Sequence, residues 1–449
     1  MDSQKIQPQL SPEIPILGRY AKRIVEGIDN NSAFDDLFAI VRDMAKEMRN
    51  QQLIPINKVT MLFEDSGTKE YDQLRTLFHT LHPKMLRSLV LGMVPHDLSD
   101  KDSPNWRIVY DPSGSGTYLA GISIGGRNGA FLTCKEIDMV IQHMGDYKRG
   151  CEVWLSNKDA YGLSQATPEQ QEYLKKALII DNHIITKNKQ WDDGDDYRQP
   201  ICISGKDGTR NIDELMAMLR RRVNPNFDPD VPQLSSPAYV GCSHMVSKRM
   251  INHNPDFSNL LSSSNVWRLL IECIRHIGLR AIVHTIPIIM VWEKPQIRLS
   301  EVLVTVLSQS LISQNGLNVI QPGTSSSSMG VGQVLLDGTK EHVWVKRAWF
   351  TENLERSLAV RLNRDIYKDA FDKVQAQQRL MPDEELRSLI DDNEKAQREI
   401  ESTRGKIVES IRNIEAQNET ARQSVDQMGK FLRSSRGMFP DLSQGEDDE

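Results

Sequence analysis

The sequence predicts an α+β protein, with a small mixed sheet and flanking helices in the centre, an N-terminal α/β region and a C-terminal helical arm. Up to about residue 90, apolar residues recur at three- and four-residue spacing, as in amphipathic helices. Glycine-bearing turns and β-branched runs then alternate with helical patterns through the middle of the chain. A seven-residue apolar repeat near the C-terminus favours a coiled coil.

The composition is that of an ordinary globular protein. The chain has 449 residues, of which 39% are hydrophobic and 26% charged, which allows two or three domains. No apolar run approaches the roughly 20 residues that a membrane helix needs. The first residues, MDSQKIQPQLSPEIP, are polar and lack the apolar core of a secretion signal. We therefore expect an intracellular protein, nuclear or cytoplasmic, with no membrane partner.

Charge is distributed unevenly along the chain. Residues 381–449 hold 10 basic and 17 acidic residues, whereas the whole chain has a net charge of −6. The globular part is therefore close to neutral, and the acidity belongs to the tail. The charge balance does not by itself predict a nucleic-acid-binding protein.

The cysteines are scattered singly, without a CxxC pair. A structural zinc site takes four ligands at close spacing, so a zinc finger is disfavoured. We expect free and mostly buried thiols in a reducing compartment. The residues concerned are Cys134, Cys151, Cys202, Cys242 and Cys273.

Residues 1–195 form the predicted N-terminal α/β region, whose role is open. After the helices, the segments WRIVY, TYLAGISI and AFLT are typical of strands separated by glycine turns. Hairpin turns explain these glycines better than a phosphate loop, because no lysine follows a GxxxxG frame. The loop around Asp192–Asp196 is acidic but lacks the glutamate that a calcium loop would place at a fixed offset.

Residues 196–322 form the predicted central domain. YVG reads as a strand, MVSKRMINH and NVWRLLIECIRHIG as helices, and LRAIVHTIPIIMVW as a second strand. A third helix is predicted over IRLSEVLVTVLSQSLISQNGLNV, with Glu301 in its first turn and Asn315-Gly316 as its C-cap. Arg249 and His253 lie four residues apart and share a face of the first of these helices.

Residues 237–322 resemble the GIY-YIG nuclease family. YVG matches the second motif of that family, and an arginine, a histidine, a glutamate and an asparagine follow in the family's order. These residues are Tyr239, Arg249, His253, Glu301 and Asn318. The resemblance covers about a fifth of the chain and implies metal-dependent cleavage of phosphodiester bonds in DNA.

The resemblance implies a role for each matched residue. Glu301 would bind Mg²⁺ or Mn²⁺ as a hard oxygen ligand, and Arg249 would hold the phosphate as charge develops on it. Tyr239 would orient or deprotonate the attacking water, with His253 assisting the proton transfer. Asn318 would form hydrogen bonds across the site and steady its geometry.

The first family motif, GIY, is not found where it is expected. The window before YVG is NFDPDVPQLSS, and the nearest strand-like segment, PICISG, contains no tyrosine. Two interpretations therefore stay open beside the nuclease: a catalytically inactive domain of the same fold that binds nucleic acid or protein, and a coiled-coil assembly protein. In the last of these, the matched residues occur in family order by chance.

Basic residues near the central domain give a second, weaker nucleic-acid signal. Arg220, Arg221 and Arg222 end a predicted amphipathic helix, and Lys248 precedes Arg249. They could contact phosphates. Basic residues also suit a helix C-terminus because of the helix dipole, and this is the preferred interpretation of the arginines.

The C-terminal part begins with a predicted serine/glycine linker and strand over residues 323–340, where VGQVLL follows GTSSSSMGVG. Residues 341–436 are predicted to be a helical, partly coiled-coil arm, and 437–449 a disordered acidic tail. Apolar residues recur every seven positions between 386 and 432, with polar interruptions, so this segment could form a homodimer. Its main row is Leu386, Asn393, Ile400, Ile407, Ile414, Ala421 and Met428.

Overall fold

The computed structural model describes residues 11–53, 63, 67–157, 166–184, 190–203, 208–323, 332–378 and 383–436. It divides into two compact units: Ile6–Arg361, and a second that holds the residues from Leu362 onward. The predicted tail 437–449 and most of the serine/glycine linker lie outside the described residues.

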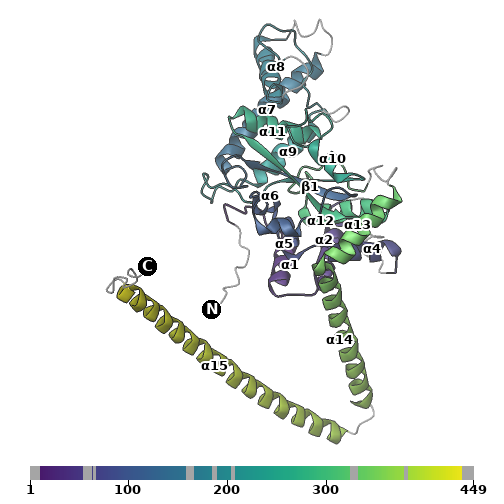
Figure 1. Ribbon diagram of the computed structural model, residues 1–449. Helices are drawn as coiled ribbons and strands as arrows, with labels where there is room; N and C mark the ends of the chain where they lie inside the picture. The colour runs from purple at the N-terminus through teal and green to yellow at the C-terminus, as the bar shows by residue number, and fades with distance from the viewer. Residues whose placement is uncertain are drawn as a thin grey trace, which may run out of the picture. The chain divides into compact units, whose positions relative to one another are not determined.

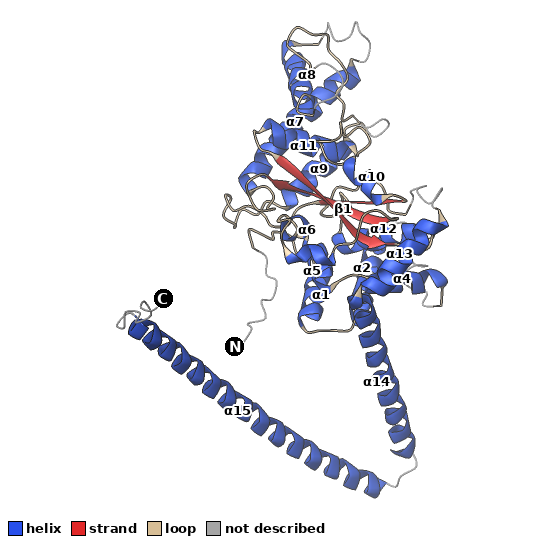
Figure 2. Cartoon of the chain, in the orientation of Figure 1, coloured by secondary structure: helices blue, strands red, loops and turns tan. Residues whose placement is uncertain are grey.

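A three-stranded antiparallel sheet forms the centre of the first unit (Figure 2). Its order is β2-β1-β3, where β1 is Gly116–Ile124, β2 is Ala238–Ser243 and β3 is Ala281–Met290. The predicted α+β class is confirmed, but the prediction of a mixed sheet is wrong, because both strand pairs are antiparallel. β1 lies between the other two strands and every residue in it is buried.

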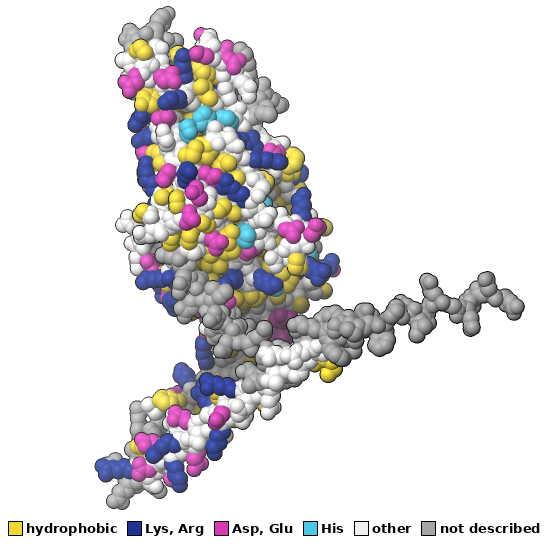
Figure 3. Space-filling view, turned by 90° about the vertical axis from the view of Figure 1, so that its left-hand side faces the viewer, with side chains coloured by type: hydrophobic (Ala, Val, Ile, Leu, Met, Phe, Trp, Pro, Cys, Tyr) yellow, Lys and Arg dark blue, Asp and Glu magenta, His cyan; other side chains and the backbone are white. Residues whose placement is uncertain are grey.

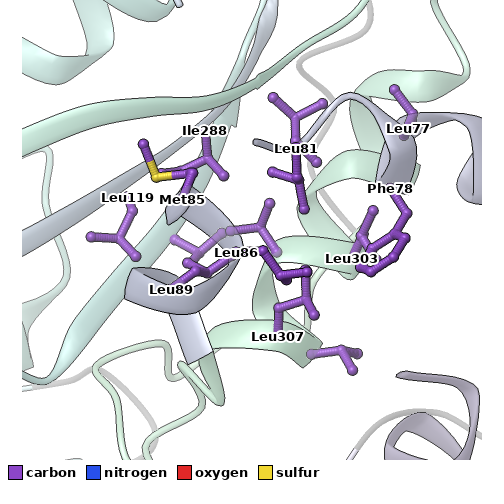
Figure 4. Packing of buried hydrophobic residues seen from close by; sticks show 14 of the residues in the cluster. Leu77, Phe78, Leu81, Met85, Leu86, Leu89, Leu119, Ile288, Leu303 and Leu307 are labelled. Carbon is purple, nitrogen blue, oxygen red and sulfur yellow. The ribbon is translucent and has the colours of Figure 1, made fainter. Parts of the chain in front are cut away.

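One face of the sheet packs against helices from both ends of the unit. These are α1 (Arg19–Asp29), α2 (Phe34–Asn50), α4 (Lys69–His79), α5 (Pro83–Leu91) and α12 (Gln296–Ser308). Figure 4 shows their apolar side chains, among them Leu86 and Leu303, meeting Leu119 of β1 and Ile288 of β3. Truncating a buried leucine such as Leu86 to alanine would cost roughly 2–5 kcal/mol of stability.

A second apolar core lies on the other side of the sheet, among the helices that Figure 1 draws there. It is built by α7 (Cys134–Ser156), α8 (Pro168–Asp181), α9 (Arg210–Arg221) and α11 (Asn265–His276). A capping box fixes the start of α7, because Thr133 and Glu136 accept each other's backbone N–H. α7, α8 and α9 all lie in sequence between β1 and β2, so one sheet takes strands from both sides of the predicted boundary at 195/196.

Several predicted strands are absent from the described residues. WRIVY is largely the 3₁₀ helix η2 (Pro104–Ile108), which begins at a proline after the capping residue Ser103. AFLT is irregular, as are the described residues of PICISG. VGQVLL opens the helix α13 (Gln333–Lys346) instead of forming a strand.

The third predicted helix, which corresponds to α12, begins and ends at other residues than predicted. α12 begins at Gln296, so Glu301 lies in its second turn and not in the first. It ends at Ser308, where Gln309 adopts a left-handed conformation with φ 49°, and Asn315-Gly316 lies beyond it. A residue other than glycine can end a helix in the left-handed conformation, so Gly316 wrongly suggested a later end of the helix.

The C-terminal residues form two long helices, α14 (Ala348–Gln378) and α15 (Asp383–Arg436). The start of α14 is fixed to the first unit, since Asn353 donates to the carbonyls of His79 and Leu81. The predicted helical structure of the arm is confirmed. Its pairing as a coiled coil stays a prediction. Among the described residues, every helix is too short or too polar to span a membrane.

Candidate functional site

A cavity of about 670 Å³ opens at the edge of the sheet. Its walls come from β1, β2, the short helix α10 (Val246–Ile251), residues 262–264, α12 and residues 318–321. We call it the tyrosine cavity, because Tyr118 and Tyr239 both line it. Four of the five predicted catalytic and metal residues also line it, and the fifth, His253, contacts both tyrosines.

The antiparallel register places the two tyrosines on the same face of the sheet. Tyr118 pairs with Gly241 and Tyr239 with Ala120, so the tyrosines are diagonal neighbours. The glycine of YVG is required by this packing: a Cβ on Gly241 would lie 2.5 Å from the Tyr118 hydroxyl. Burial raises the pKa of both tyrosines, and the positive charge of Arg249 opposes the shift.

His253 lies behind the tyrosines, fully buried. Its Nε2 is 2.8 Å from the Tyr118 hydroxyl, its Nδ1 is 3.2 Å from Ser263 Oγ, and its ring centroid is 4.7 Å from that of Tyr239. Burial, with the nearby Arg249 charge, lowers the pKa of His253 to about 3. The imidazole is therefore neutral at pH 7, and a proton on Nδ1 would leave Nε2 free to accept from Tyr118.

Arg249 brings positive charge to the cavity from α10. Its Nη2 donates to the carbonyl of Ser262 at 3.2 Å, which ties α10 to the opposite wall. Arg249 also forms hydrogen bonds with Tyr118 and Tyr239. A guanidinium has five N–H donors, so donors remain that could bind an oxyanion.

Among the described residues that line the cavity, Glu301 is the one carboxylate. Burial raises its pKa, while hydrogen bonds from the Gly323 N–H and the Cys242 thiol oppose the shift. The Gly323 N–H donates to Oε2 at 2.8 Å. One half-buried carboxylate in an open cavity fits Mg²⁺, which is commonly held by one or two carboxylates together with water and phosphate oxygens.

Asn318 forms a two-point contact with the strand that carries Tyr239. Its Nδ2 donates to the Val240 carbonyl at 2.7 Å, and its Oδ1 accepts from the Val240 N–H at 2.8 Å. The side chain amide thus continues the edge of β2 as a further backbone would. Asn318 is therefore a positioning residue.

The four predicted phosphate-contacting residues have different environments. Arg222 is buried, and its guanidinium donates to Gln233 and Ser235, so the prediction that it contacts phosphate is wrong. Arg221 donates to the carbonyls of Ile312 and Gln314. Arg220 and Lys248 are exposed. Figure 3 shows acidic and basic side chains interspersed on the face that it presents, without a field of one sign.

Tyr118 is the site residue that the sequence analysis missed. The sequence analysis expected a tyrosine on a strand shortly before YVG. The strand that carries Tyr118 lies much further upstream, because α7, α8 and α9 come between β1 and β2. The signal that could have found it is Gly116-Thr117-Tyr118, a glycine and tyrosine at the start of a predicted strand. The strand that carries Tyr118, β1, is the neighbour of the strand that carries Tyr239, β2.

A second group of ionisable residues lies apart from the cavity. Asp181, Cys202 and Glu272 are buried, and their ligand atoms all lie within 4.8 Å of one another. We call them the carboxylate cluster. It could hold a metal ion. Glu272 also accepts from Arg268 Nε at 2.7 Å, with side-chain exposures of 1% for Arg268 and 0% for Glu272.

Burial dominates the electrostatics of the carboxylate cluster. It raises the pKa of Glu272 to about 8 and that of Asp181 to about 6. The Tyr147 hydroxyl donates to Asp181 at 2.8 Å, and Cys202 Sγ lies 3.5 Å from Glu272. As expected, all five cysteines are buried thiols outside any disulfide.

Comparisons with family models, curated proteins and solved structures found no match to this chain. Function must therefore be inferred from the geometry of the two groups described above.

Proposed function

We propose that the chain is a metal-dependent endonuclease that cleaves phosphodiester bonds in DNA through a GIY-YIG-like domain. The observation that carries the proposal is the convergence on one cavity of Tyr118, Tyr239, Arg249, His253 and Glu301. These residues come from β1, β2, α10, the following loop and α12. Phosphodiester hydrolysis needs a group that orients the attacking water, a cation for the phosphate and a ligand for a metal ion, and this set supplies all three.

In this proposal, Gly116-Thr117-Tyr118 takes the place of the family's first motif. Support comes from the register, in which Tyr118 and Tyr239 are diagonal neighbours on adjacent antiparallel strands. The helices α7, α8 and α9 are then an insertion between two motifs that are near each other in space. The catalytic tyrosine that the sequence lacked before YVG is thus supplied from far upstream.

The side chains divide the reaction among them. Arg249 binds the phosphate as negative charge grows on its oxygens. Tyr239 orients the attacking water, and the neutral Nε2 of His253, 2.8 Å away, accepts a hydrogen bond from the Tyr118 hydroxyl and fixes its position in the cavity wall. Asn318 holds β2 so that Tyr239 keeps its direction.

Glu301 would hold the Mg²⁺ or Mn²⁺ ion. When bound, the ion supplies charge neutralisation for the phosphate and the leaving oxygen. The Gly323 N–H fixes one oxygen of the Glu301 carboxylate, so the direction of the other is set by the protein.

Incubation of purified protein with plasmid and branched DNA, with Mg²⁺ or Mn²⁺, tests the proposal. We expect nicking that requires the metal and is lost in Glu301→Ala. Folded protein that binds DNA without nicking it would support the catalytically inactive alternative. Folded protein that neither binds nor nicks DNA would support the remaining alternative, a coiled-coil assembly protein.

We further propose that the arm forms a homodimer, which would pair two active sites. On α15, Ile400, Ile407 and Ile414 recur every seven residues and are 67%, 54% and 56% exposed in the single chain. A second helix that covered this row would remove three large aliphatic side chains from water. Sedimentation velocity should show a dimer that Ile407→Lys dissociates, and a concentration-independent monomer would contradict the proposal.

A further inference from the structure

The ring of His253 is held in one orientation by the groups that surround it. It is fully buried and lies in a T-shaped arrangement with Trp267, whose indole N–H donates to the His253 carbonyl at 3.1 Å. In this orientation Nε2 faces the Tyr118 hydroxyl at 2.8 Å, and Nδ1 faces Ser263 Oγ at 3.2 Å. A neutral imidazole carries one proton, so one of these nitrogens donates and the other accepts.

The second hydrogen bond of Ser263 indicates which nitrogen carries the proton. The Ser263 hydroxyl donates to the carbonyl of Asn252, the residue after α10, at 3.1 Å. Among the described residues, no other group donates to that carbonyl. A hydroxyl has one proton to donate, so Ser263 Oγ accepts from His253. The proton is then on Nδ1, which leaves Nε2 to accept from Tyr118.

The opposite direction would leave two of these groups without partners. If Ser263 donated to Nδ1, the Asn252 carbonyl would lose its donor, and Nε2–H would donate to the Tyr118 oxygen. The proton of the buried Tyr118 hydroxyl would then lose its acceptor. A buried polar group without a partner costs stability, so the hydrogen bonds run from Tyr118 through His253 and Ser263 to Asn252.

We infer that Ser263 is a positioning residue of the tyrosine cavity, which fixes the tautomer of His253 and thereby the direction in which the Tyr118 hydroxyl donates. With its proton directed to His253, Tyr118 presents its oxygen to the guanidinium of Arg249, with which it forms a hydrogen bond. A guanidinium can only donate, so a Tyr118 proton turned the other way would disturb this contact.

The consequence for cleavage rests on the proposed function, in which Arg249 binds the phosphate. The tautomer of His253 does not depend on it. The two parts of the inference can therefore be measured separately, the tautomer in the free protein and the consequence in a cleavage assay.

NMR of protein labelled at the histidine ring nitrogens tests the tautomer, because protonated and bare ring nitrogens have distinct chemical shifts. Tyr118→Phe, which removes the partner of Nε2, identifies the His253 signal. We expect the proton on Nδ1 in the wild type and in Ser263→Thr, which keeps the hydroxyl. Ser263→Ala removes the acceptor and should shift the population toward Nε2–H. The wild-type spectrum tests the direction of the hydrogen bonds even if Ser263→Ala does not fold.

The cleavage assay measures the consequence. In Ser263→Ala, kcat/KM should fall about tenfold, as the loss of one hydrogen bond to a buried group does. Ser263→Thr should restore it. The control is Ser156→Ala, at an exposed position at the end of α7, which should cleave as the wild type does.

A wild type with the proton on Nε2 would overturn the inference. So would an unchanged His253 signal in Ser263→Ala, even with slower cleavage, because the loss would then come from packing alone. Cutting by the wild type together with either result would retain the nuclease and reject the role of Ser263. A wild type that does not cut DNA, but whose tautomer changes in Ser263→Ala, would support the direction of the hydrogen bonds and reject the nuclease.

Discussion

The tyrosine cavity and the carboxylate cluster lie along the same helix but are built in different ways. Ser264, the N-cap of α11, lines the cavity, and Glu272 of the cluster lies two turns further along α11. Burial raises the pKa of an acid in both places, Glu301 and Glu272. In the cluster the side chains are each other's partners, whereas in the cavity they line an open space.

The difference teaches that burial of an ionisable group does not by itself mark a functional site. Structural ion-pair networks shift pKa values as strongly as active sites do. Space for a ligand beside the shifted groups distinguishes the cavity. We therefore expect changes in the cavity to affect cleavage, and changes in the cluster to affect stability.

The largest expected effect is on cleavage, in the variant Glu301→Gln. Removing the carboxylate should lower the rate of metal-dependent cleavage by roughly a thousandfold, because the metal ion contributes several kcal/mol to the transition state. The control is Glu341→Gln, at an exposed position on α13. Plasmid nicking at saturating Mg²⁺ measures both, and equal loss in the two variants would contradict the assignment.

The next effect is on stability, in the carboxylate cluster. Glu272→Ala removes the carboxyl that accepts from Arg268 Nε and leaves this buried guanidinium with the Asn259 carbonyl alone, which should cost roughly 3–5 kcal/mol of unfolding free energy. Replacing both residues, as Arg268→Met/Glu272→Leu, should cost less, because no unpaired charge remains. Urea denaturation measures both variants. A double variant as unstable as the single one would show that packing, and not charge, dominates here.

Two buried tyrosines provide a matched pair. The hydroxyl groups of Tyr118 and Tyr147 each lie 2.8 Å from a partner, His253 and Asp181 respectively. Tyr118→Phe should lower cleavage about a hundredfold, as the loss of one hydrogen-bonding group beside the reacting atoms does. Tyr147→Phe should instead cost about 1–2 kcal/mol of unfolding free energy and leave the cleavage rate unchanged. The reverse pattern would show that the functional site had been assigned to the wrong group.

These two tyrosines also show what the sequence could and could not predict. Local patterns predicted the α+β class, most of the helices, and the strands around Tyr118 and Tyr239, because periodicity is a local signal. No local signal states which strands pair when three helices lie between them. The partner of Tyr239 was therefore sought in the wrong window, although the strand that carries it had been predicted.

Arg222 illustrates a second limit. It is the C-cap residue of α9 and follows Arg220 and Arg221, and three adjacent arginines suggest a basic surface. The turn at the end of the helix directs Arg222 inward to Gln233, where burial lowers its pKa to about 10. Residues on one helix end can face opposite ways, and only the tertiary packing shows which.

The pH dependence of stability has opposite signs for Glu272 of the cluster and His253 behind the cavity. The pKa of Glu272 is raised from 4.5 to about 8, so the folded state binds more protons than the unfolded state between these values. Stability from this group is present below about pH 4.5 and is lost as pH rises toward 8. The slope is at most about 1.4 kcal/mol per pH unit for one proton. Asp181, raised to about 6, acts in the same direction.

His253 has the opposite effect. Its pKa is lowered from 6.5 to about 3, so its contribution is present above pH 6.5 and is lost as pH falls toward 3. Urea denaturation of the wild type and of Glu272→Gln at pH 5, 6.5 and 8 isolates the contribution of Glu272 to the pH dependence of stability. The variant should lose less stability than the wild type between pH 5 and 8. Parallel curves would mean that Glu272 is ionised throughout.

The smallest expected effect tests how the carboxylate of Glu301 is positioned. Gly323 has φ 76°, and a Cβ added there would lie 3.1 Å from a methyl carbon of Val302. Gly323→Ala should therefore strain the backbone by roughly 1–2 kcal/mol and displace the N–H that donates to Glu301. The Mg²⁺ concentration for half-maximal cleavage should rise by about three- to fivefold, since supporting hydrogen bonds tune metal affinity.

The matched control is Gly332→Ala, with φ −71° and no atom within 4 Å of the added Cβ. If both alanines leave the Mg²⁺ requirement unchanged, the direction of the carboxylate is set within α12 itself, and the Gly323 N–H is a consequence of the site and not a part of it.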